Sequence, residues 1–319
     1  MAEYVVVADI GATNTRLGFM TSKGQLLWPS RFSTQDFADD PSLLISRIAD
    51  SIASIPTDGI RGIGLSFAGP TDNITGTASL TNLRGWEDPV PVRDLLSHCN
   101  LPIFMGNDAT LAALAEFRYG VQCENLAYLT LSTGVGGGVI LDGKMYTGAN
   151  GAAAEFGHIQ VNHVRAYSRR CGCGRHGCLE SEISGTAIVD RAVEKLGIDL
   201  GWEMERYLKT HQLNVGGMNA KIVADMATAG IVEASDIWMT AGRYLGKALQ
   251  VIALAYNPEV IVIGGSVGEK ASDLFLPEAV EVFREGFLPN CSARVRVTNL
   301  GDQISLLGVC ALVEEKLGH

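Results

Sequence analysis

The sequence has little basic charge for its length. Acidic residues outnumber basic residues by 35 to 25, which gives a net charge of -10. Such a surface repels the phosphates of nucleic acids and the head groups of anionic membranes, and no local run of Lys and Arg reverses the balance. We therefore expect neither a nucleic acid nor a membrane as a partner.

Long apolar runs are also missing. The N-terminal stretch MAEYVVVADIGATN has no basic segment, and its apolar run covers only 4–8, which is too short for a secretion signal. The most apolar helix candidate, 245–256, is interrupted by Lys247 and Gln250, so it is not a membrane span. A cytoplasmic location is expected, and the odd number of cysteines, seven, fits a compartment in which thiols stay reduced.

The chain contains no linker, low-complexity tract or block of like charges. Its length suggests about two domains, and a hydrophobic content of 47% is ample for buried cores. The domain boundary must then lie inside compact structure, and we place it at Asn107. The expected units are a smaller N-terminal domain, 1–107, onto which a C-terminal helix, 304–319, packs back, and a larger domain, 108–303.

Two stretches share one pattern of elements. A buried β-branched strand, 4–8, is followed by the small-residue loop DIGATNTR and a second strand, LGFM. The later stretch NLAYLTLSTGVGGGVILDGKMY again runs from a strand through a Gly/Thr/Ser loop to a strand and a turn. This repetition predicts two related α/β halves. Helices are expected at 42–55, 108–120, 184–196, 219–229, 236–256 and 304–317.

Neither glycine loop is a standard nucleotide motif. The stretch STGVGGG lacks the Gly-Lys-Ser/Thr ending of a Walker A loop and leads into a strand. Glycines nonetheless let the backbone approach a ligand, and successive N–H groups can bind an anion; for one loop alone, a tight hairpin with bulges is the alternative. Two such loops favour phosphate binding, and Asp9 of the first loop suits Mg²⁺. A third glycine pair, Gly264 and Gly265, ends another predicted strand, where α/β proteins tend to place ligands.

Asp108 is a candidate for a catalytic base. It lies where a predicted strand gives way to a predicted helix, directly after Gly106 and Asn107. One interpretation is a helix N-cap, a position that Asp favours. The other is a carboxylate at the end of a strand that points into a cleft and serves as a general base.

Three of the seven cysteines lie within eight positions, in the stretch RRCGCGRHGCLE. Thiolate and imidazole are the ligands that zinc prefers, and four of them form a closed, structural site. Chance burial is the alternative, and the intervening glycines and flanking arginines make it implausible. The predicted zinc ligands are His158, Cys171, Cys173 and Cys178, with His163 and His176 as alternative fourth ligands.

Together these motifs resemble the ROK family of sugar kinases, within the actin-like ATPase superfamily. The resemblance covers essentially the whole chain and rests, in order, on DIGATNTR, GND with the following helix, LSTGVGGGVILDGKMYTGANG, AEFGH, CGCGRHGCLE and VIVIGG. It implies two actin-like, ribonuclease H-like α/β domains flanking a cleft, as in hexokinases. It also implies an ATP-dependent hexose kinase, with glucose and its 6-hydroxyl as the expected substrate.

The resemblance assigns roles to individual residues. Asp108 would take the proton from the sugar hydroxyl as its oxygen attacks the γ-phosphate of ATP. His158 would bind zinc through one ring nitrogen and sugar through the other. The sugar-binding residues would be Asn82, Asn107, Asp108, Glu155, His158 and Glu180. The residues for ATP and Mg²⁺ would be Asp9, Gly11, Thr13, Asn14, Thr15, Thr133, Gly134, Gly136 and Gly137, with Gly264 and Gly265 near the adenosine.

Two positions depart from the family pattern, because Ala12 and Ala154 stand where the family usually has glycine. We expect adjusted loop packing and no loss of activity. The alternatives within the enzyme class are an N-acetylmannosamine or N-acetylglucosamine kinase, and the alternative of another class is a non-catalytic sugar sensor. Repressors of the family carry an N-terminal helix-turn-helix domain, which is not expected here because the first phosphate loop begins at Asp9. A homo-oligomer, either a dimer or a tetramer, is expected.

Overall fold

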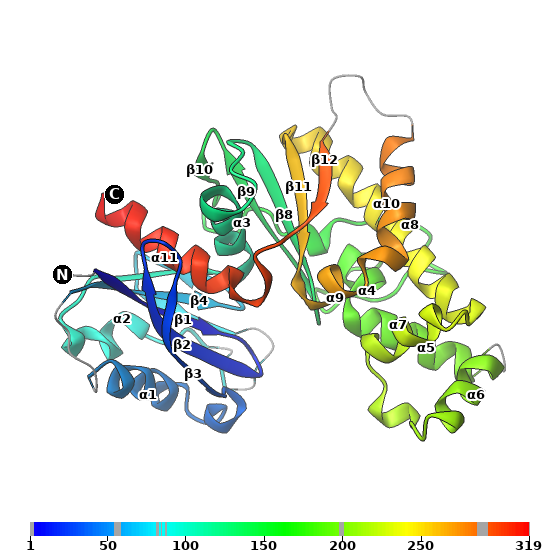
Figure 1. The fold of residues 1–319 in the computed structure, drawn as a ribbon, viewed down its shortest axis with the longest axis horizontal. Coiled ribbons are helices and arrows are strands. Elements are labelled where there is room, and N and C mark those ends of the chain that lie inside the picture. Colours follow the sequence, from blue (N-terminus) through cyan, green and yellow to red (C-terminus); the bar gives the residue numbers. More distant parts are fainter. Residues whose placement is uncertain are drawn as a thin grey trace. The chain divides into compact units, whose positions relative to one another are not determined.

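The computed structural model describes residues 3–53, 59–80, 83, 85–86, 88–197, 201–285 and 293–318 (Figure 1). The chain forms two compact units, each assembled from separate segments. The first comprises Met1–Glu124, Gly138–Ala153 and Asp302–His319, and the second comprises Asn125–Gly137 and Ala154–Gly301.

A five-stranded sheet forms the centre of the first unit. Its strands are β1 (Tyr4–Ile10), β2 (Asn14–Thr21), β3 (Leu26–Ser33), β4 (Ile60–Phe67) and β7 (Ile103–Asn107). They lie in the order β3-β2-β1-β4-β7, with β1 antiparallel to β2 and parallel to β4. The apolar run that predicts β1 is buried on both sides, as expected for a central strand whose sheet is covered on both faces. A short ribbon, β5 (Thr71–Asp72) and β6 (Thr77–Ala78), follows β4.

One face of this sheet is covered by α1 (Pro41–Ala53), with the short α2 (Val92–Leu95) beside it. The apolar residues of α1 recur at helical spacing, so one stripe of the helix turns to the sheet. Leu44, Ile45 and Ile48 are fully buried and belong to one hydrophobic cluster with Val6 of β1 and Ile63 of β4. The predicted helix 42–55 is therefore present in the described part of its span.

The opposite face is covered by the C-terminal helix, α11 (Ile304–Leu317), which also packs against α3 (Asp108–Tyr119). In Figure 1 this red helix lies beside the blue N-terminal strands. A Cβ on Gly64 would lie 2.4 Å from Cγ1 of Val309, and one on Gly308 would lie 2.0 Å from the carbonyl oxygen of Leu111. Glycine at both positions lets α11 approach the sheet and α3 closely.

The two units differ from the predicted domains in where they divide. The helix α3 and the segment Gly138–Ala153 belong to the first unit, whereas the predicted boundary lay at Asn107. The helix α3 belongs to the first unit because it follows β7 directly and packs extensively against α11, which covers the sheet of that unit. The sequence indicates where this helix begins, but it does not indicate which sheet the helix covers.

The second sheet repeats the strand order of the first. Its strands are β8 (Leu126–Leu131), β9 (Val135–Leu141), β10 (Lys144–Met145), β11 (Val260–Gly264) and β12 (Arg294–Val297), in the order β10-β9-β8-β11-β12. β11 runs parallel to β8 and β12, just as β4 runs parallel to β1 and β7. The relation between two α/β halves that the hairpins predict is thus present in the topology. The division between the compact units falls inside β9.

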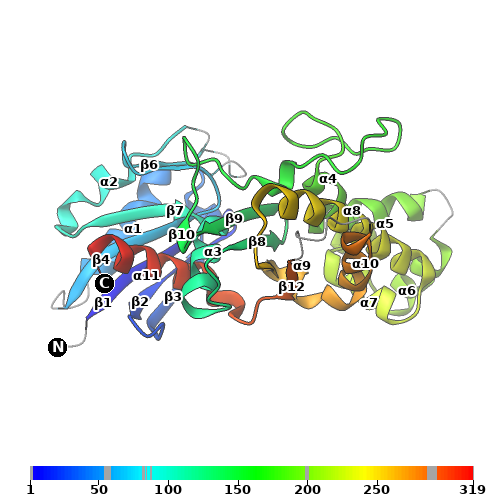
Figure 2. The same ribbon diagram turned by 90° about the horizontal axis from the view of Figure 1, so that it is seen from above.

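Helices make up most of the remaining second unit (Figure 2). They are α4 (Leu179–Ile183), α5 (Gly185–Gly197), α6 (Trp202–Thr210), α7 (Ala220–Thr228), α8 (Val232–Tyr256), α9 (Gly265–Lys270) and α10 (Ser272–Arg284). The long α8 packs against α10, α7 and α4. None of the helices in the described part of the chain has both the length and the apolar composition needed to cross a membrane.

Candidate active site and metal centre

The first glycine loop is a tight turn between β1 and β2. The N–H of Gly11 donates to the carbonyl oxygen of Asn14 at 3.1 Å. Thr13 is exposed, whereas Thr15 is fully buried and its hydroxyl lies 2.9 Å from that of Thr34. Of the two threonines predicted to bind phosphate, only Thr13 therefore presents its side chain at the surface of this loop.

Asp9, the predicted Mg²⁺ ligand, forms an ion pair with Arg16. One oxygen of Asp9 lies 2.6 Å from a terminal nitrogen and 3.2 Å from Nε of Arg16. A terminal nitrogen of the same guanidinium donates to the carbonyl oxygen of Asp302, just before α11. The sequence analysis missed this role of Arg16, although the residue closes the quoted DIGATNTR motif. Facing positions on an antiparallel pair of strands are the signal that could have found it.

The start of α3 shows which residue caps this helix, and so bears on the two interpretations of Asp108. Asn107 is the N-cap, because its side-chain oxygen accepts from the N–H groups of Ala109 and Thr110 at 3.0 and 3.2 Å. Asp108 is the first residue of the helix and is half-buried. Its Oδ1 lies 2.8 Å from the N–H of Ala109, and a carboxylate in a first turn is favoured by the helix dipole. The N-cap role thus belongs to Asn107.

The second glycine loop is held on three sides within its unit. The N–H of Gly185, at the start of α5, donates to the carbonyl oxygen of Ser132 at 2.7 Å. The N–H of Ser266 donates to the hydroxyl of Ser132 at 3.1 Å, and the hydroxyl of Thr186 donates to the carbonyl oxygen of Thr133 at 3.1 Å. Gly265 has a φ of +83°, and a Cβ there would lie 2.5 Å from the carbonyl oxygen of Leu131. The predicted glycine pair at the junction of β11 and α9 is therefore beside this loop.

Glu180, a predicted sugar ligand, contacts the same loop. Its Oε2 accepts a hydrogen bond from the N–H of Val135 at 3.1 Å. A Cβ on Gly134 would lie 2.7 Å from that oxygen. The absence of a side chain at Gly134 thus leaves room for the Glu180 carboxylate against the loop.

The segment that contains Glu155 and His158 also packs on this loop. A Cβ on Gly157 would lie 2.2 Å from the carbonyl oxygen of Val135, so glycine is required for this approach. Glu155 is exposed, and its carbonyl oxygen accepts from the N–H of His158 at 3.0 Å in a single turn. Within the second unit the segment that contains Glu155 and His158 thus packs, like the Glu180 carboxylate, against one glycine loop.

The two alanines that depart from the family pattern have different backbones. Ala154 has a φ of +62°, in the left-handed region that favours glycine. Ala12 is not among the positive-φ residues. Only Ala154 therefore carries backbone strain in place of the glycine that is usual in the family.

His158 and the three clustered cysteines form a group of four donors. One donor atom from each can be chosen so that all four lie within 4.8 Å of one another. Nδ1 of His158 lies 3.6 Å from Sγ of Cys171, and Sγ of Cys173 lies 3.7 Å from Sγ of Cys178. With Zn–S bonds of about 2.3 Å, the edges of a tetrahedron are about 3.8 Å long. The donor set and its spacing therefore fit a tetrahedral metal site.

The structure also distinguishes between the three candidate histidines. Only His158 belongs to the group of four, whereas the ring of His176 is near the carbonyl oxygen of Ser168, at 3.4 Å from Nδ1. His163 is exposed and lies outside the group.

The thiols of the cluster have unequal pKa values. Hydrogen bonds from the backbone and then the side chain of Arg175 lower the pKa of Cys173 to about 6. Burial raises the pKa of Cys178 to about 12 and also raises that of Cys171. A cation would have to displace protons from the buried thiols, which makes its affinity dependent on pH.

The predicted site residues are divided between the units. Asp9, Gly11, Thr13, Asn14, Thr15, Asn107 and Asp108 belong to the first unit; Thr133, Gly134, Gly136, Gly137, Glu155, His158, Glu180, Gly264 and Gly265 belong to the second. Asn82 lies outside the described residues.

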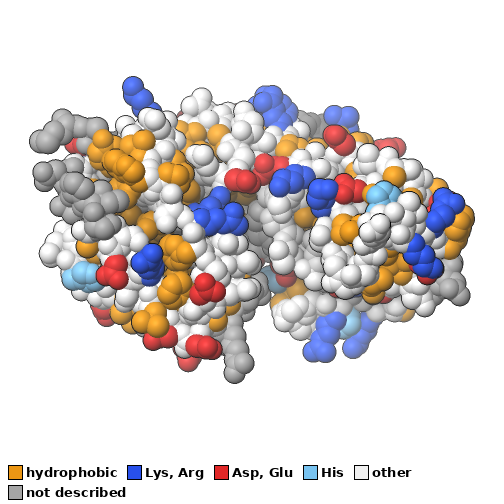
Figure 3. Space-filling view, turned by 60° about the horizontal axis from the view of Figure 1, so that its bottom comes forward, with side chains coloured by type: hydrophobic (Ala, Val, Ile, Leu, Met, Phe, Trp, Pro, Cys, Tyr) orange, Lys and Arg blue, Asp and Glu red, His pale blue; other side chains and the backbone are white. Residues whose placement is uncertain are grey.

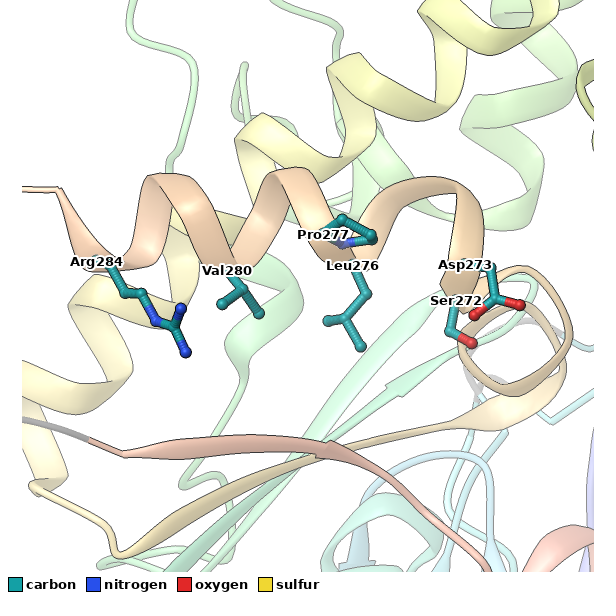
Figure 4. A pocket seen from close by; sticks show the side chains of 6 residues that line it. All are labelled: Ser272, Asp273, Leu276, Pro277, Val280 and Arg284. Carbon is teal, nitrogen blue, oxygen red and sulfur yellow. The ribbon is translucent and has the colours of Figure 1, made fainter.

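A separate groove runs along α10 and shares no residue with the predicted site. In Figure 4 the side chains of Leu276, Val280 and Arg284 line one side of the helix, and Ser272 and Asp273 lie at its N-terminal end. On the face that Figure 3 shows, acidic and basic side chains are interspersed among apolar and neutral ones.

The ROK family profile matches residues 5–316. The chain belongs to the ROK family. It is 33% identical to a glucokinase of Halalkalibacterium halodurans, over 98% of this chain and 96% of that one. It is 32% identical to an N-acetylmannosamine kinase of Yersinia pestis, over 82% of each chain, and 29% identical to a xylose repressor of Caldicellulosiruptor bescii, over 97% of this chain and 77% of the repressor.

Solved structures of the family share the fold. A ROK family glucokinase from Streptomyces griseus in complex with glucose and AMPPNP superposes with a TM-score of 0.79 at 27% identity, covering 98% of this chain and 99% of that one. The predicted family and the actin-like α/β fold are thereby confirmed.

Proposed function

We propose that this ROK family member is an ATP-dependent hexose kinase, and that glucose, phosphorylated at its 6-hydroxyl, is the substrate. The arrangement at the start of α3 carries this proposal. Asn107 is the N-cap of this helix, and Asp108 is its first residue, directly after β7, so the capping role does not oppose the assignment of Asp108 as the base. The curated glucokinase that is similar over nearly the full length supports the choice of glucose.

Asp108 would remove the proton of the sugar hydroxyl as the oxygen attacks the γ-phosphate. General base catalysis of this kind requires a carboxylate within hydrogen-bonding reach of the hydroxyl in the bound complex. The transfer itself depends mostly on positioning and on stabilising the charge of the phosphoryl group.

We assign Glu155, His158 and Glu180 of the second unit as sugar ligands, and the family resemblance adds Asn82, Asn107 and Asp108. Carboxylates accept hydrogen bonds from sugar hydroxyls, and a histidine whose Nδ1 faces a metal retains its other ring nitrogen for the sugar. The packing of Glu180 and of the segment that contains Glu155 and His158 on one glycine loop supports this assignment.

The nucleotide would bind at the glycine loops. N–H groups of the two loops, other than those of Gly11 and Val135, which are bonded within the protein, would hold phosphate oxygens, and Gly264 and Gly265 would lie near the adenosine. The AMPPNP-bound glucokinase of similar fold supports ATP as the phosphoryl donor. Mg²⁺, which neutralises the phosphates when bound, would face Asp9 directly or through water, in exchange for part of its pairing with Arg16.

We further infer that the cluster of His158, Cys171, Cys173 and Cys178 holds one Zn²⁺. Four nitrogen and sulfur ligands leave no open position, so the ion would be structural. It would fix the chain at both ends of the segment from His158 to Cys178. Cys178 lies two residues before Glu180.

Two other functions have support among the relatives. An N-acetylmannosamine kinase is favoured by an identity of 32%, but over a smaller part of the chain than the glucokinase match. A non-catalytic sensor is favoured by the similarity to a xylose repressor, but such a protein has no need of a base beside phosphate loops.

A coupled assay of ATP consumption decides between these functions. It should compare glucose, mannose, fructose, N-acetylglucosamine and N-acetylmannosamine at equal concentrations. The proposal requires the highest kcat/KM for glucose. A higher value for N-acetylmannosamine would assign the alternative kinase, and sugar binding without ATP consumption would assign the sensor.

A further inference from the structure

A buried carboxylate lies two residues after Glu180 on the same short helix. Glu182 of α4 has no exposed surface, and its Oε2 forms an ion pair with the guanidinium of Arg191 on α5. Nε of Arg191 also lies 3.4 Å from the carbonyl oxygen of Glu182. Burial of a charge is unfavourable unless the group is paired and hydrogen-bonded. The position of Glu182 is therefore strongly determined by its partners.

The other oxygen of Glu182 binds the segment that joins the first two ligands of the cluster. Its Oε1 accepts from the backbone N–H of Arg169 at 3.1 Å and from Nδ2 of Asn162 at 3.2 Å. Both donors lie between His158 and Cys171. Glu182 thus holds this loop near each of its ends.

The same network reaches α8 through Tyr244. Nδ2 of Asn162 lies 3.0 Å from the hydroxyl of Tyr244, and the guanidinium of Arg191 lies 5.8 Å from the centre of its ring. Burial, and next the charge of Glu182, raises the pKa of Tyr244, so the phenol stays protonated. In Figure 2 the green loops that precede α4 extend above α4 in the view.

We propose that Glu182 is a positioning residue for the sugar subsite. Through Arg191 and the N–H of Arg169 it fixes α4 against the segment between His158 and Cys171. This arrangement places Glu180 and His158 together. The inference rests on the proposed function, in which these two residues are sugar ligands. Because none of the named partners of Glu182 lies in a glycine loop, its loss should weaken sugar binding and leave ATP binding intact.

The double variant Glu182→Leu/Arg191→Leu tests this role. It removes both charges and leaves no unpaired charge in the interior, so the fold is expected to persist. Loss of such supporting partners typically weakens a site by about 10–100-fold, and we expect the KM for glucose to rise by about tenfold. The KM for ATP and the zinc content, measured on the same preparation, should remain as in the wild type.

Two single variants calibrate the result. Glu194→Gln removes an exposed carboxylate that lies 2.8 Å from the guanidinium of Arg169, and it should leave both KM values unchanged. Glu182→Gln keeps an oxygen that can accept from the N–H of Arg169, and it should give a smaller rise in the KM for glucose than the double variant. If the double variant does not fold, Glu182→Gln decides by the same measurements.

The outcomes separate this inference from the proposed function. A wild-type protein that phosphorylates no hexose overturns the proposed function. An active wild type, together with a folded variant whose KM for glucose is unchanged, overturns the positioning role alone. Equal increases in the KM for glucose and for ATP, or loss of zinc from the double variant, would mean a general structural role and would also overturn it.

Discussion

The loop between β1 and β2 in the first unit and the loop between β8 and β9 in the second occupy equivalent places in two sheets of identical order. The first is stabilised by an ion pair between Asp9 and Arg16 and by two buried hydroxyls. The second is packed against glycines, the carboxylate of Glu180 and the turn of His158. One topology thus supports an acidic loop, at which we propose a cation, and a neutral loop in contact with the proposed sugar ligands.

The largest expected effect is in the first unit. Asp108→Asn keeps the shape of the side chain and removes the base, so kcat should fall by about 10²–10⁴-fold while sugar affinity is largely retained. Steady-state kinetics and calorimetric titration with glucose measure the two quantities. A turnover close to that of the wild type would remove Asp108 from its proposed role.

The next effect concerns the metal cluster of the second unit. Cys173→Ser should abolish the proposed zinc binding and raise the KM for glucose by about tenfold or more, because the proposed ion would fix the chain at His158 and before Glu180. The thermal midpoint should fall too, while the KM for ATP changes little. Cys123→Ser, a cysteine of the first unit outside the cluster, is the matched control. A well-prepared wild type with far less than one zinc per chain would contradict the assignment.

A smaller effect tests the contact between Glu180 and the second loop. Gly134→Ala introduces a Cβ 2.7 Å from Oε2 of Glu180, so the carboxylate must leave the N–H of Val135. Loss of a hydrogen bond to a charged group corresponds to about 1.5 kcal/mol, and the KM for glucose should rise by about tenfold at most. Because both loops are proposed to hold phosphates, Gly134→Ala and Gly11→Ala should each raise the KM for ATP, but only Gly134→Ala should also raise the KM for glucose. Equal sensitivity of glucose binding to both substitutions would remove the distinction between the loops.

The smallest effect compares the two departures from the family pattern. Ala154→Gly should raise stability by roughly 0.5–1 kcal/mol, because it relieves a left-handed backbone that disfavours Cβ. Ala12→Gly should lower stability by roughly 0.5 kcal/mol. Glycine adds conformational entropy to the unfolded chain, and at Ala12 no relief of backbone strain compensates for it. Thermal denaturation of both variants measures the difference. Shifts of the same sign would contradict the role of the backbone at Ala154.

The elements and groups predicted from the sequence are those formed by neighbouring residues. The cysteine cluster lies within a short window, and the strand-to-helix junction at Asp108 follows from Gly106, Asn107 and the helical pattern behind it. The edge strand β3 was missed because Pro29 and its largely exposed residues are atypical of a strand. The helix α10 was missed because Pro277 lies inside it.

Contacts between distant residues could not be predicted in the same way. Glu182 resembles an ordinary helix-surface glutamate until Arg191 and Arg169 are placed around it. Thr15 looks like a phosphate-binding residue until the hydroxyl of Thr34 is found beside it. Such roles depend on tertiary packing, which local patterns do not encode.

The position of α11 has a consequence for how the chain folds during synthesis. Domains commonly fold in order from the N-terminus as they leave the ribosome. Here the strands β1, β4 and β7 are made early, but the helix that covers one face of their sheet is translated after the whole second unit. The apolar face that α11 covers in the folded unit therefore stays uncovered until the second unit has been translated.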